Sequence, residues 1–137
     1  MTANIEVIER LPMVEEHAKL WEAVGWGKVN QEMTAKSLAG SLYGLVVRHE
    51  GATIGMGRIV GDGNMYFYIQ DVAVLPEYQG QGLGSRIVTQ LLRYIEAHSY
   101  PGAFVGLFAS HGNDTFYEQY GFRNHAPGMT GMFKVIE

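Results

Sequence analysis

The fold is decided by residues 65–98, which read MYFYIQDVAVLPEYQGQGLGSRIVTQLLRYIEAH. The run from Met65 to Leu75 is rich in tyrosine, phenylalanine, isoleucine and valine, a composition typical of a buried strand. Pro76 closes this run, and the segment Gln79–Gly84 that follows has a glycine at every second position. From Ser85 onward, apolar residues recur with the 3.6-residue period of an amphipathic helix. The sequence therefore predicts a strand, a glycine loop and a helix, in that order.

The predicted loop has the chemistry of an anion site. Backbone N–H groups in the first turn of a helix have no partners within the helix, and the helix dipole adds positive charge there. Alternating glycines allow positive φ angles and keep side chains away from these N–H groups. A plain strand-to-helix turn would need the same glycines, so the glycines alone leave that alternative open. The complete order of strand, proline, loop and helix favours a phosphate or pyrophosphate site.

Two common nucleotide-binding motifs fit this loop poorly. A P-loop has Gly-Lys-Ser/Thr after its glycines, whereas Gly84 is followed by Ser85 and Arg86. A dinucleotide-binding loop reads G-x-G-x-x-G and has an acidic residue at the end of a second strand about 20 residues later. Here the chain is still in the predicted helix at that distance. A nucleotide-binding domain is therefore the weaker alternative.

A third pattern matches residues 71–84, DVAVLPEYQGQGLG, over their full length. This segment resembles the acetyl-coenzyme A signature of the GNAT superfamily of N-acetyltransferases, in which a strand ending in V-x-P leads into Q/R-G-x-G-x-G/A. A second segment, Phe116–Phe122 (FYEQYGF), resembles the F-Y-x-x-x-G-F signature of the same family. The order of the predicted elements is similar to that of the family over nearly the whole chain.

Length and composition limit the classes of protein that the chain can belong to. With 137 residues it is expected to form one domain, residues 1–137, and its 47% apolar and 18% charged residues are typical of a soluble globular protein. A formal net charge of −4 without a lysine and arginine cluster argues against a nucleic-acid partner. The absence of cysteine excludes disulfides and a cysteine nucleophile. No apolar segment resembles a signal peptide or a membrane span, so we expect a cytoplasmic protein without a membrane partner.

We expect an α/β (α+β) fold with a mixed, mostly antiparallel sheet of six to seven strands and helices on both faces. The expected strands are Ile5–Ile8, Leu42–His49, Ala52–Val60, Met65–Leu75, Phe104–Ala109 and Met129–Val135. Glu50 and Gly51 form a hairpin turn between the second and third strands. The expected helices are Pro12–Val24, Thr34–Gly40 with Thr34 as its cap, Ser85–His98 and Asn113–Tyr120.

The resemblance implies where acetyl-coenzyme A (acetyl-CoA) would bind. In GNAT folds the parallel strands four and five splay apart, and the cosubstrate lies in the gap. The main chain of Val72, Ala73 and Val74 would contact the pantetheine arm. The pyrophosphate would bind to the loop, mainly through backbone N–H groups, and the residues concerned are Gln79, Gly80, Gln81, Gly82, Leu83, Gly84 and Ser85.

The second signature supplies further expected contacts. Phe116 and Tyr117 open this signature, and the family often uses the tyrosine to protonate the leaving thiolate. The alternative is a packing tyrosine with its hydroxyl at the surface. Many family members have an asparagine seven residues before the tyrosine, where this chain has Ser110. Asn113 is the candidate substitute for that contact, although its register differs.

The general base is less clearly marked. Asp71 is the only charged residue in an apolar strand, and an unpaired charge there would be unfavourable. It is a candidate base, and the alternative is an aspartate locked by backbone hydrogen bonds or by Arg58. His111 is a second candidate base, for which a loop role is the alternative. The remaining histidines show no ligand spacing, so no metal site is expected.

The function that the resemblance implies is direct transfer of an acetyl group from acetyl-CoA to a primary amine in a ternary complex. The expected acceptor is a small molecule. The oxyanion would be stabilised by a main-chain N–H group near Ala73 or Val74. An alternative is a non-catalytic acyl-CoA-binding sensor or partner subunit, which would keep the glycine loop without needing Tyr117. Small GNAT domains often form homodimers through sheet edges or the C-terminal strand, so a homodimer is included in this expectation.

Overall fold

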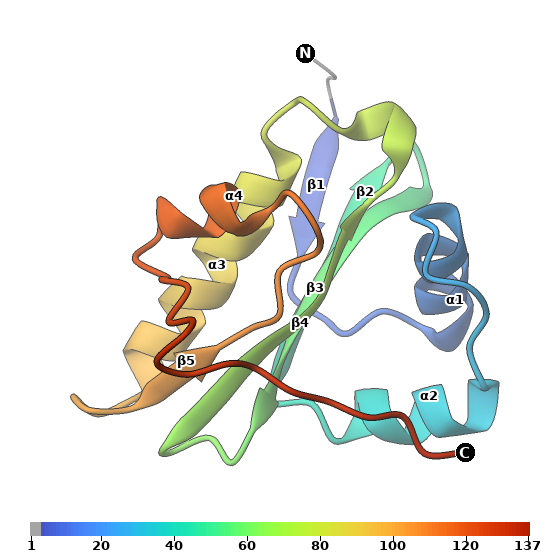
Figure 1. Ribbon diagram of the computed structural model, residues 1–137. Helices are drawn as coiled ribbons and strands as arrows, with labels where there is room; N and C mark the ends of the chain where they lie inside the picture. The colour runs from blue at the N-terminus through green and yellow to red at the C-terminus, as the bar shows by residue number, and fades with distance from the viewer. Residues whose placement is uncertain (1–3) are drawn as a thin grey trace. The chain divides into compact units, whose positions relative to one another are not determined.

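The computed structural model describes residues 4–137, and Figure 1 shows the order of their elements. The chain forms two compact units, one ending at Val105 and the other running from Gly106 to Glu137. The first unit contains most of the sheet and three α-helices, and the second contains one short helix with extended chain around it. The single domain expected from the chain length stays a prediction.

The first unit is built on one five-stranded sheet with the order β1-β2-β3-β4-β5. Successive strands from β1 to β4 pair antiparallel. The last strand follows helix α3 (Leu83–His98), and Figure 1 shows it running in the same direction as β4. The predicted mixed, mostly antiparallel sheet is therefore confirmed. Its strands are β1 (Ile5–Ile8), β2 (Tyr43–His49), β3 (Ala52–Gly61), β4 (Tyr66–Val74) and β5 (Phe104–Gly106).

The hairpin between β2 and β3 turns where the sequence predicts. Glu50 and Gly51 both have positive φ angles, 50° and 79°. Two consecutive left-handed residues form a type I′ turn, whose twist matches that of the flanking strands. The turn sets the register of the adjacent residues, His49 with Ala52 and Arg48 with Thr53, and the register then shifts between Arg48 and Val47.

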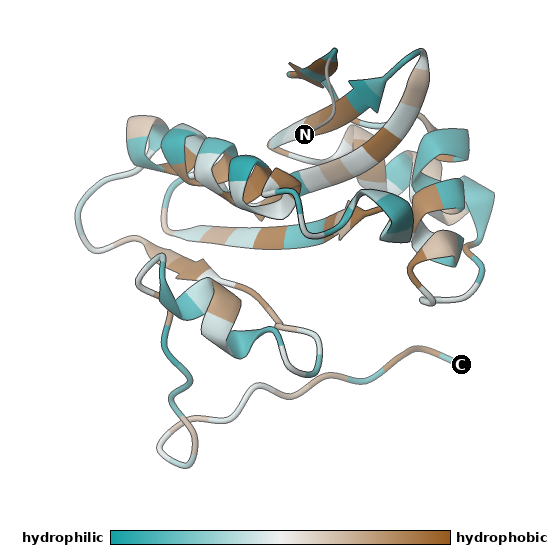
Figure 2. Cartoon of the chain, turned by 90° about the horizontal axis from the view of Figure 1, so that it is seen from above, coloured by the Kyte–Doolittle hydropathy of each residue, from teal (hydrophilic) through white to brown (hydrophobic). Residues whose placement is uncertain are grey.

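Helices cover both faces of the sheet, as expected. Figure 1 shows α1 (Val14–Ala23) and α2 (Gln31–Ala39) on one side and α3 on the other, and Figure 2 shows hydrophobic and hydrophilic residues alternating along α3. The second helix starts earlier than predicted, because Asn30 caps it by accepting a hydrogen bond from the Met33 N–H (2.9 Å), and Thr34 lies buried inside the helix. No helix in the described part of the chain is long and apolar enough to cross a membrane.

The core of the first unit lies between the sheet and these helices. Its largest side chains have less than 2% of their surface exposed, and burying each one stabilises the fold by about 1.5–3 kcal/mol. Apolar residues at the predicted helical spacing in α3 supply one side of this core. The fully buried residues are Leu20, Leu45, Val46, Val47, Ile54, Met56, Ile59, Phe67, Ile87, Val88 and Leu91.

The expected number of strands, six to seven, is wrong, because the described sheet has five. Residues 129–135 were expected to form a further strand but have no strand pairing, and the unit of residues 106–137 contains no other strand with which they could pair. A strand needs a partner for its backbone groups, which an alternating apolar pattern does not guarantee. The fifth strand is also shorter than predicted, since β5 ends at Gly106 rather than at Ala109.

The second unit holds the helix α4 (Asp114–Glu118), which is shorter than the predicted Asn113–Tyr120. Aromatic side chains gather on and after this helix: the ring centroid of Phe116 lies 5.0 Å from that of Tyr117 and 5.7 Å from that of Tyr120. Beyond them the chain has no regular secondary structure apart from a turn at residues 126–128, and large apolar side chains are exposed. These side chains belong to Met129, Met132, Phe133, Val135 and Ile136.

Candidate functional site

The glycine loop lies between the 3₁₀ turn η1 (Pro76–Tyr78) and the first residue of α3. Gly80 and Gly82 both have φ angles of +81°, and a Cβ atom at either position would have no neighbour within 4 Å. These positions therefore need glycine for their backbone conformation, and the space beside them is open. The residues expected to hold a pyrophosphate are brought together in this turn, where Gln79 to Gly82 are exposed and Leu83 is buried.

The N-terminus of α3 offers hydrogen-bond donors to a ligand. The first helical hydrogen bond runs from the Arg86 N–H to the Gly82 oxygen (3.1 Å), so the N–H groups of Leu83 and Gly84 have no acceptor within the helix. Among the four described α-helices, α3 alone has no acidic residue in its first turn. Its positive end is therefore not neutralised by its own first turn and is suited to a bound anion.

Two side-chain contacts fix the start of the loop. The amide Nε2 of Gln79 donates to the Val74 oxygen (2.9 Å), which ties the loop to the end of β4. The hydroxyl of Tyr78 lies 2.8 Å from Nδ1 of His49, which ties η1 to the end of β2. The side chain of Gln79 therefore has an anchoring role, and its main-chain N–H bonds to the Pro76 oxygen (3.2 Å).

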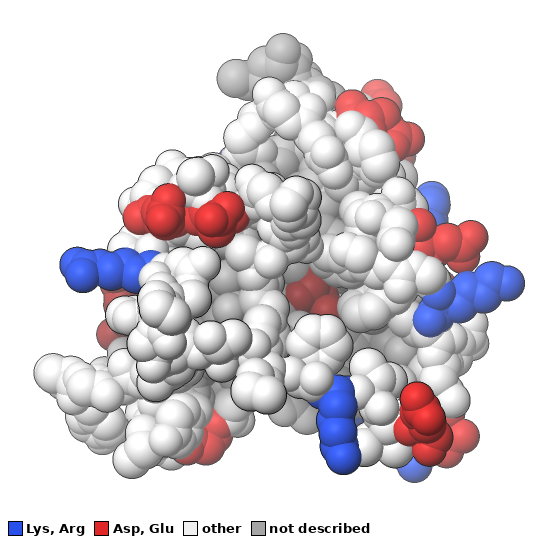
Figure 3. Space-filling view, viewed as in Figure 1, with Lys and Arg blue, Asp and Glu red and all other residues white. Residues whose placement is uncertain are grey.

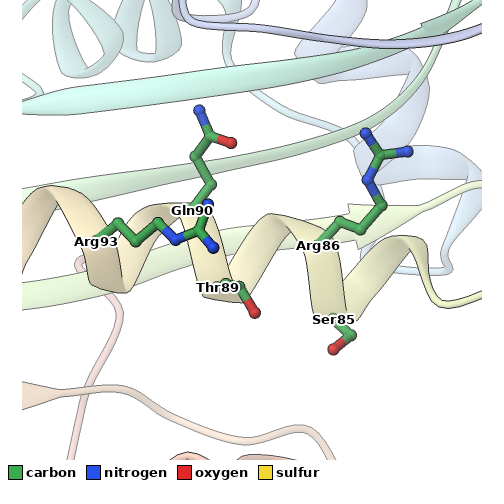
Figure 4. Close-up of a pocket in the computed structure, with 5 residues that line it drawn as sticks. All are labelled: Ser85, Arg86, Thr89, Gln90 and Arg93. Atoms are coloured by element: carbon green, nitrogen blue, oxygen red, sulfur yellow. The ribbon is translucent and has the colours of Figure 1, made fainter.

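A surface pocket of about 270 Å³ lies along the first half of α3 (Figure 4). Two of its residues, Arg86 and Arg93, are exposed and have no acidic partner among the described residues. A basic side chain near a helix N-terminus does not favour the helix itself, because both carry positive charge. It would favour an anion bound beside the loop. The pocket is lined by Ser85, Arg86, Thr89, Gln90 and Arg93.

Charge elsewhere is dispersed. On the face drawn in Figure 3, lysine and arginine side chains lie apart from one another and form no continuous basic patch. The formal net charge of the chain is −4. Nucleic-acid surfaces are usually strongly basic. The expected absence of a nucleic-acid partner stays a prediction.

A β-bulge interrupts the pairing of β4 with β3. Ala73 pairs with Met56 and Gln70 pairs with Arg58, so that Asp71 and Val72 together lie opposite one residue, Gly57. Asp71 takes up the extra length with a left-handed φ of 59°. A bulge of this kind bends its strand and redirects the main chain that follows. The segment redirected here, Val72 to Val74, is the one expected to contact pantetheine.

The outer edge of β4 has no strand partner over its second half in the described part of the chain. The neighbour on that side is β5, which has three residues against the nine of β4, and its Phe104 N–H bonds to the Met65 oxygen (2.7 Å) at the start of β4. From Gln70 to Val74 no strand lies on that side in the described part of the chain. The expected splay of strands four and five stays a prediction. An extended ligand with amide groups could pair with such an edge.

Asp71 forms a buried ion pair. Its side chain is 5% exposed, and its Oδ2 lies 2.7 Å from Nε of Arg58 and 3.0 Å from Nε2 of His17. Burial alone would raise the pKa of the Asp71 carboxyl, but the hydrogen bonds and charges of His17 and Arg58 outweigh burial and lower it. Of the two roles that the sequence leaves open for Asp71, this geometry favours the aspartate locked by Arg58, since such a carboxylate is a weak base.

Tyr117 lies on α4, in the second unit, and is half-buried. Its ring packs edge-on against Phe116 and Phe122, at 5.0 and 6.1 Å between centroids. Burial raises the pKa of the Tyr117 phenol above its ordinary value of 10.0, so the hydroxyl stays protonated at neutral pH. A protonated phenol is able to act as an acid. Its catalytic role stays a prediction.

The other predicted residues of the second unit lie around α4. Asn113 precedes the helix, is exposed and makes no capping hydrogen bond with its side chain. His111 is exposed in the preceding turn. Phe116 packs in the aromatic cluster with Tyr117. A contact of Asn113 with a cosubstrate therefore stays a prediction.

The part played by His17 was not among the predictions from the sequence. This residue lies on α1, is 3% exposed and contacts a carboxylate that is 54 positions further along the chain. One signal was present: a histidine on the apolar face of a helix and an aspartate in an apolar strand each need a buried partner. Because one side chain can donate a hydrogen bond and the other can accept it, a contact between the two residues could have been predicted.

The sequence profile of the Acetyltransferase (GNAT) domain family matches residues 14–132. The chain belongs to the GNAT acetyltransferase family. The resemblance that the two sequence signatures carry is thereby confirmed, and acetyl transfer is the chemistry that the family supports.

Solved and curated proteins agree with this membership. This GNAT chain is 32% identical to a probable acetyltransferase of unknown function from methicillin-resistant Staphylococcus aureus, with a TM-score of 0.91 over 96% of this chain and 99% of the other. It is 38% identical over 86 residues to GCN5-related N-acetyltransferase 2 of Arabidopsis thaliana, a chloroplastic protein (63% of this chain, 33% of that protein). It is 28% identical over 122 residues to the uncharacterized N-acetyltransferase ycf52 of Porphyra purpurea (86% and 69%). The chain thus spans only part of the length of these curated relatives.

Proposed function

We propose that this GNAT protein is an N-acetyltransferase that transfers an acetyl group from acetyl-CoA to a primary amine within a ternary complex. The observation that carries the proposal is the glycine loop at the N-terminus of α3, which directly follows the open edge of β4. The free N–H groups of Leu83 and Gly84 suit a pyrophosphate, and the open edge suits the amides of a pantetheine arm. Acetyl-CoA carries both groups along one chain.

The charge of the residues around the loop also supports acetyl-CoA as the ligand. In our proposal the pyrophosphate binds along the loop from Gly80 to Ser85, and the pantetheine arm follows the main chain of Val72 to Val74. Arg86 adds positive charge beside the loop, and Arg93 extends that charge along the pocket of Figure 4. These arginines have no acidic partner among the described residues, so a phosphate need not displace one.

The chemical step needs few groups. The lone pair of the neutral amine attacks the thioester carbon, which forms a C–N bond and an oxyanion, and a main-chain N–H near Ala73 or Val74 stabilises the oxyanion. The C–S bond then breaks, and the leaving thiolate takes the phenolic proton of Tyr117. The chain has no cysteine, so transfer is direct rather than through an acetyl-cysteine intermediate.

After the attack, the nitrogen loses one proton to water in this proposal, and water returns a proton to the Tyr117 phenolate, so that the cycle balances. Asp71 is a poor acceptor for the amine proton, because Arg58 and His17 already occupy its Oδ2 and keep its pKa low. The acceptor that we propose is a small primary amine, whose approach the net negative charge of the chain would favour. The cytoplasmic location expected from the sequence belongs to the same proposal.

We also propose that the protein is a homodimer. Residues 129–136 expose Met132, Phe133, Val135 and Ile136 by 76–85%. Exposed apolar surface of this kind commonly marks a protein–protein interface, and a second copy would cover it. Light scattering after gel filtration should give twice the mass of one chain, and Phe133→Asp with Ile136→Asp should give a monomer. A monomeric wild-type protein would contradict the homodimer.

The experiment that tests the catalytic proposal is release of free thiol from acetyl-CoA, measured against amines, amino acids, polyamines, aminosugars and peptide N-termini. Titration calorimetry with acetyl-CoA would be run alongside it. We expect binding of acetyl-CoA and thiol release that depends on one class of amine. Binding without release from any amine would favour a non-catalytic sensor instead. No binding would contradict the assignment of the loop.

A further inference from the structure

The bulge in β4 is held in an unfavourable backbone conformation. Asp71 has a φ of 59°, and among the described non-glycine residues only Asn4 and Glu50 also have positive φ. Asn4 precedes the first strand and Glu50 lies in a hairpin turn, so Asp71 is the one such residue inside a strand. Conformations of this kind persist only where surrounding contacts enforce them. Here the hydrogen bonds of the Asp71 side chain are contacts that can enforce this conformation.

Arg58 holds Asp71 from the neighbouring strand. Its Nε donates to Asp71 Oδ2 at 2.7 Å, while its Nη1 donates to the Ser37 oxygen (3.2 Å) and to Ser41 Oγ (2.9 Å). The two serines lie on α2 and just after it. Because Nη1 is bound to the two serines, the guanidinium of Arg58 is held in place. Arg58 therefore links Asp71 to the end of α2.

His17 holds Asp71 from α1. The imidazole is 3% exposed, and its Nε2 lies 3.0 Å from Asp71 Oδ2. Because an ionised carboxylate only accepts hydrogen bonds, Nε2 of His17 is the donor in this contact. The other ring nitrogen, Nδ1, is buried and has no hydrogen-bond partner among the described residues. In the described part of the chain, the hydrogen bond of the His17 side chain is thus with Asp71, and the ring also stacks on Trp21, with 5.3 Å between centroids.

The opposite face of the bulge is closed by α3. Gly57 faces Asp71 and Val72 across the ladder, and a Cβ there would lie 2.6 Å from Ile87 Cγ2 and 3.1 Å from Leu91 Cδ1. The helix therefore rests directly on the backbone of β3 at this point. Helix α3 packs against one face of the sheet at the bulge, and the side chains of His17 and Arg58 bind Asp71 on the other face. A movement of the bulge towards either face would therefore break a contact.

We infer that His17 and Arg58 are positioning residues that hold Asp71 and thereby direct the main chain of Val72 to Val74 towards the pantetheine arm. This inference rests on the proposed function. Neither residue touches the cosubstrate in this account. Both act through Asp71 on the bulge, and the bulge sets the direction of the β4 edge. Loss of either contact should therefore weaken acetyl-CoA binding more than the loss of stability alone would.

The test compares variants of two neighbouring residues on α1. His17→Leu removes the donor to Asp71, whereas His17→Gln keeps an N–H donor of similar reach. Glu16→Gln is the matched control, because Glu16 is bound to Arg10 and Arg48, away from the bulge. Titration calorimetry would give the Kd for acetyl-CoA, and thermal unfolding would give the Tm. We expect His17→Leu to raise Kd about tenfold, His17→Gln to stay within about threefold, and Glu16→Gln to lower Tm without changing Kd.

Each other outcome has a definite meaning. Unchanged Kd in His17→Leu, or an equal rise in Kd for Glu16→Gln at matched loss of Tm, would overturn the inference. So would loss of the acidic limb of the pH–rate profile in His17→Leu at constant Kd, since that result would make the pair a base. Should His17→Leu fail to fold, Arg58→Lys supplies the same comparison, with a raised Kd expected. Failure of the wild-type protein to bind acetyl-CoA would refute the proposed function itself, and the inference with it.

Discussion

The side-chain amide of Gln79 donates a hydrogen bond to the main-chain oxygen of Val74, with 2.9 Å between Nε2 and the oxygen. This contact joins the first residue of the glycine loop to the last residue of β4. The loop and the strand edge are the two parts of the proposed acetyl-CoA site. Their spacing is therefore fixed by a side chain as well as by the short chain between them.

Gln79→Leu should weaken acetyl-CoA binding while leaving turnover at saturation nearly unchanged. A hydrogen bond of this type contributes about 1 kcal/mol, so we expect a rise of about fivefold in KM. Steady-state kinetics of thiol release would measure KM and kcat separately. Glu77→Gln, at an exposed position of the adjacent turn, is the control and should behave as wild type. A fall in kcat at constant KM in Gln79→Leu would contradict the anchoring role.

Gly82→Ala should destabilise the start of α3 and weaken acetyl-CoA binding. The residue has φ +81°, and no atom would obstruct a Cβ, so the cost is conformational and amounts to about 1–2 kcal/mol. A decrease of about 3–6 °C in Tm should follow. Gly82→Asn should lose less, because asparagine tolerates the left-handed region better. Equal losses for alanine and asparagine would show that contacts rather than φ decide this position.

Tyr117→Phe should reduce kcat about a hundredfold and leave the Kd for acetyl-CoA nearly unchanged. Since burial raises the pKa of the Tyr117 phenol above its ordinary value of 10.0, the protonated form is present throughout the neutral range and is lost only at higher pH. The alkaline limb of the wild-type kcat profile should therefore lie above pH 10 and disappear in the variant. Tyr120→Phe, in the same aromatic cluster, is the control. Wild-type turnover in Tyr117→Phe would remove this tyrosine from the mechanism.

Acid should destabilise the fold through Glu16. A hydrogen bond from Arg10, followed by contacts with the Met13 N–H and Thr53, lowers the pKa of Glu16 from 4.5 to about 2, although burial opposes the shift. The stabilisation is therefore complete above pH 4.5 and is lost as the pH falls towards 2. Allowing for solvent screening, we expect this loss to be about 1–2 kcal/mol.

Urea unfolding between pH 2 and 7 would measure the contribution of Glu16. The pH dependence of the free energy of unfolding should be shallower in Glu16→Gln than in wild type. Glu15→Gln is the control, because Glu15 is exposed in the same helical turn. An equal pH dependence in wild type and Glu16→Gln would contradict the lowered pKa.

Local chemistry made much of the fold predictable. The hairpin at Glu50 and Gly51 and the order of strand, loop and α3 depend on turn residues and periodicity, which are properties of short segments. The cap of α2 was misassigned because Asn30 and Thr34 are both good capping residues one helical turn apart, and only the structure shows which accepts the Met33 N–H.

Features that depend on pairing between distant segments could not be predicted. The bulge at Asp71 arises from the register of β4 against β3, and alternation within β4 contains no sign of it. The contact between His17 and Asp71 joins residues 54 positions apart. The segment Met129–Val135 has a strand-like pattern but no strand partner in its own unit. The glycine loop and Tyr117 could be named from their motifs, whereas the residues that position them could not.

The most direct test of the central claim is amide hydrogen exchange, measured with and without saturating acetyl-CoA. The account predicts slower exchange in peptides that cover residues 72–85, because the loop N–H groups and the β4 edge would be occupied by the ligand. Peptides from β1 and from the hairpin of β2 and β3 serve as internal controls and should be little changed. Unchanged exchange over residues 72–85 at saturating acetyl-CoA would contradict the assignment of the site.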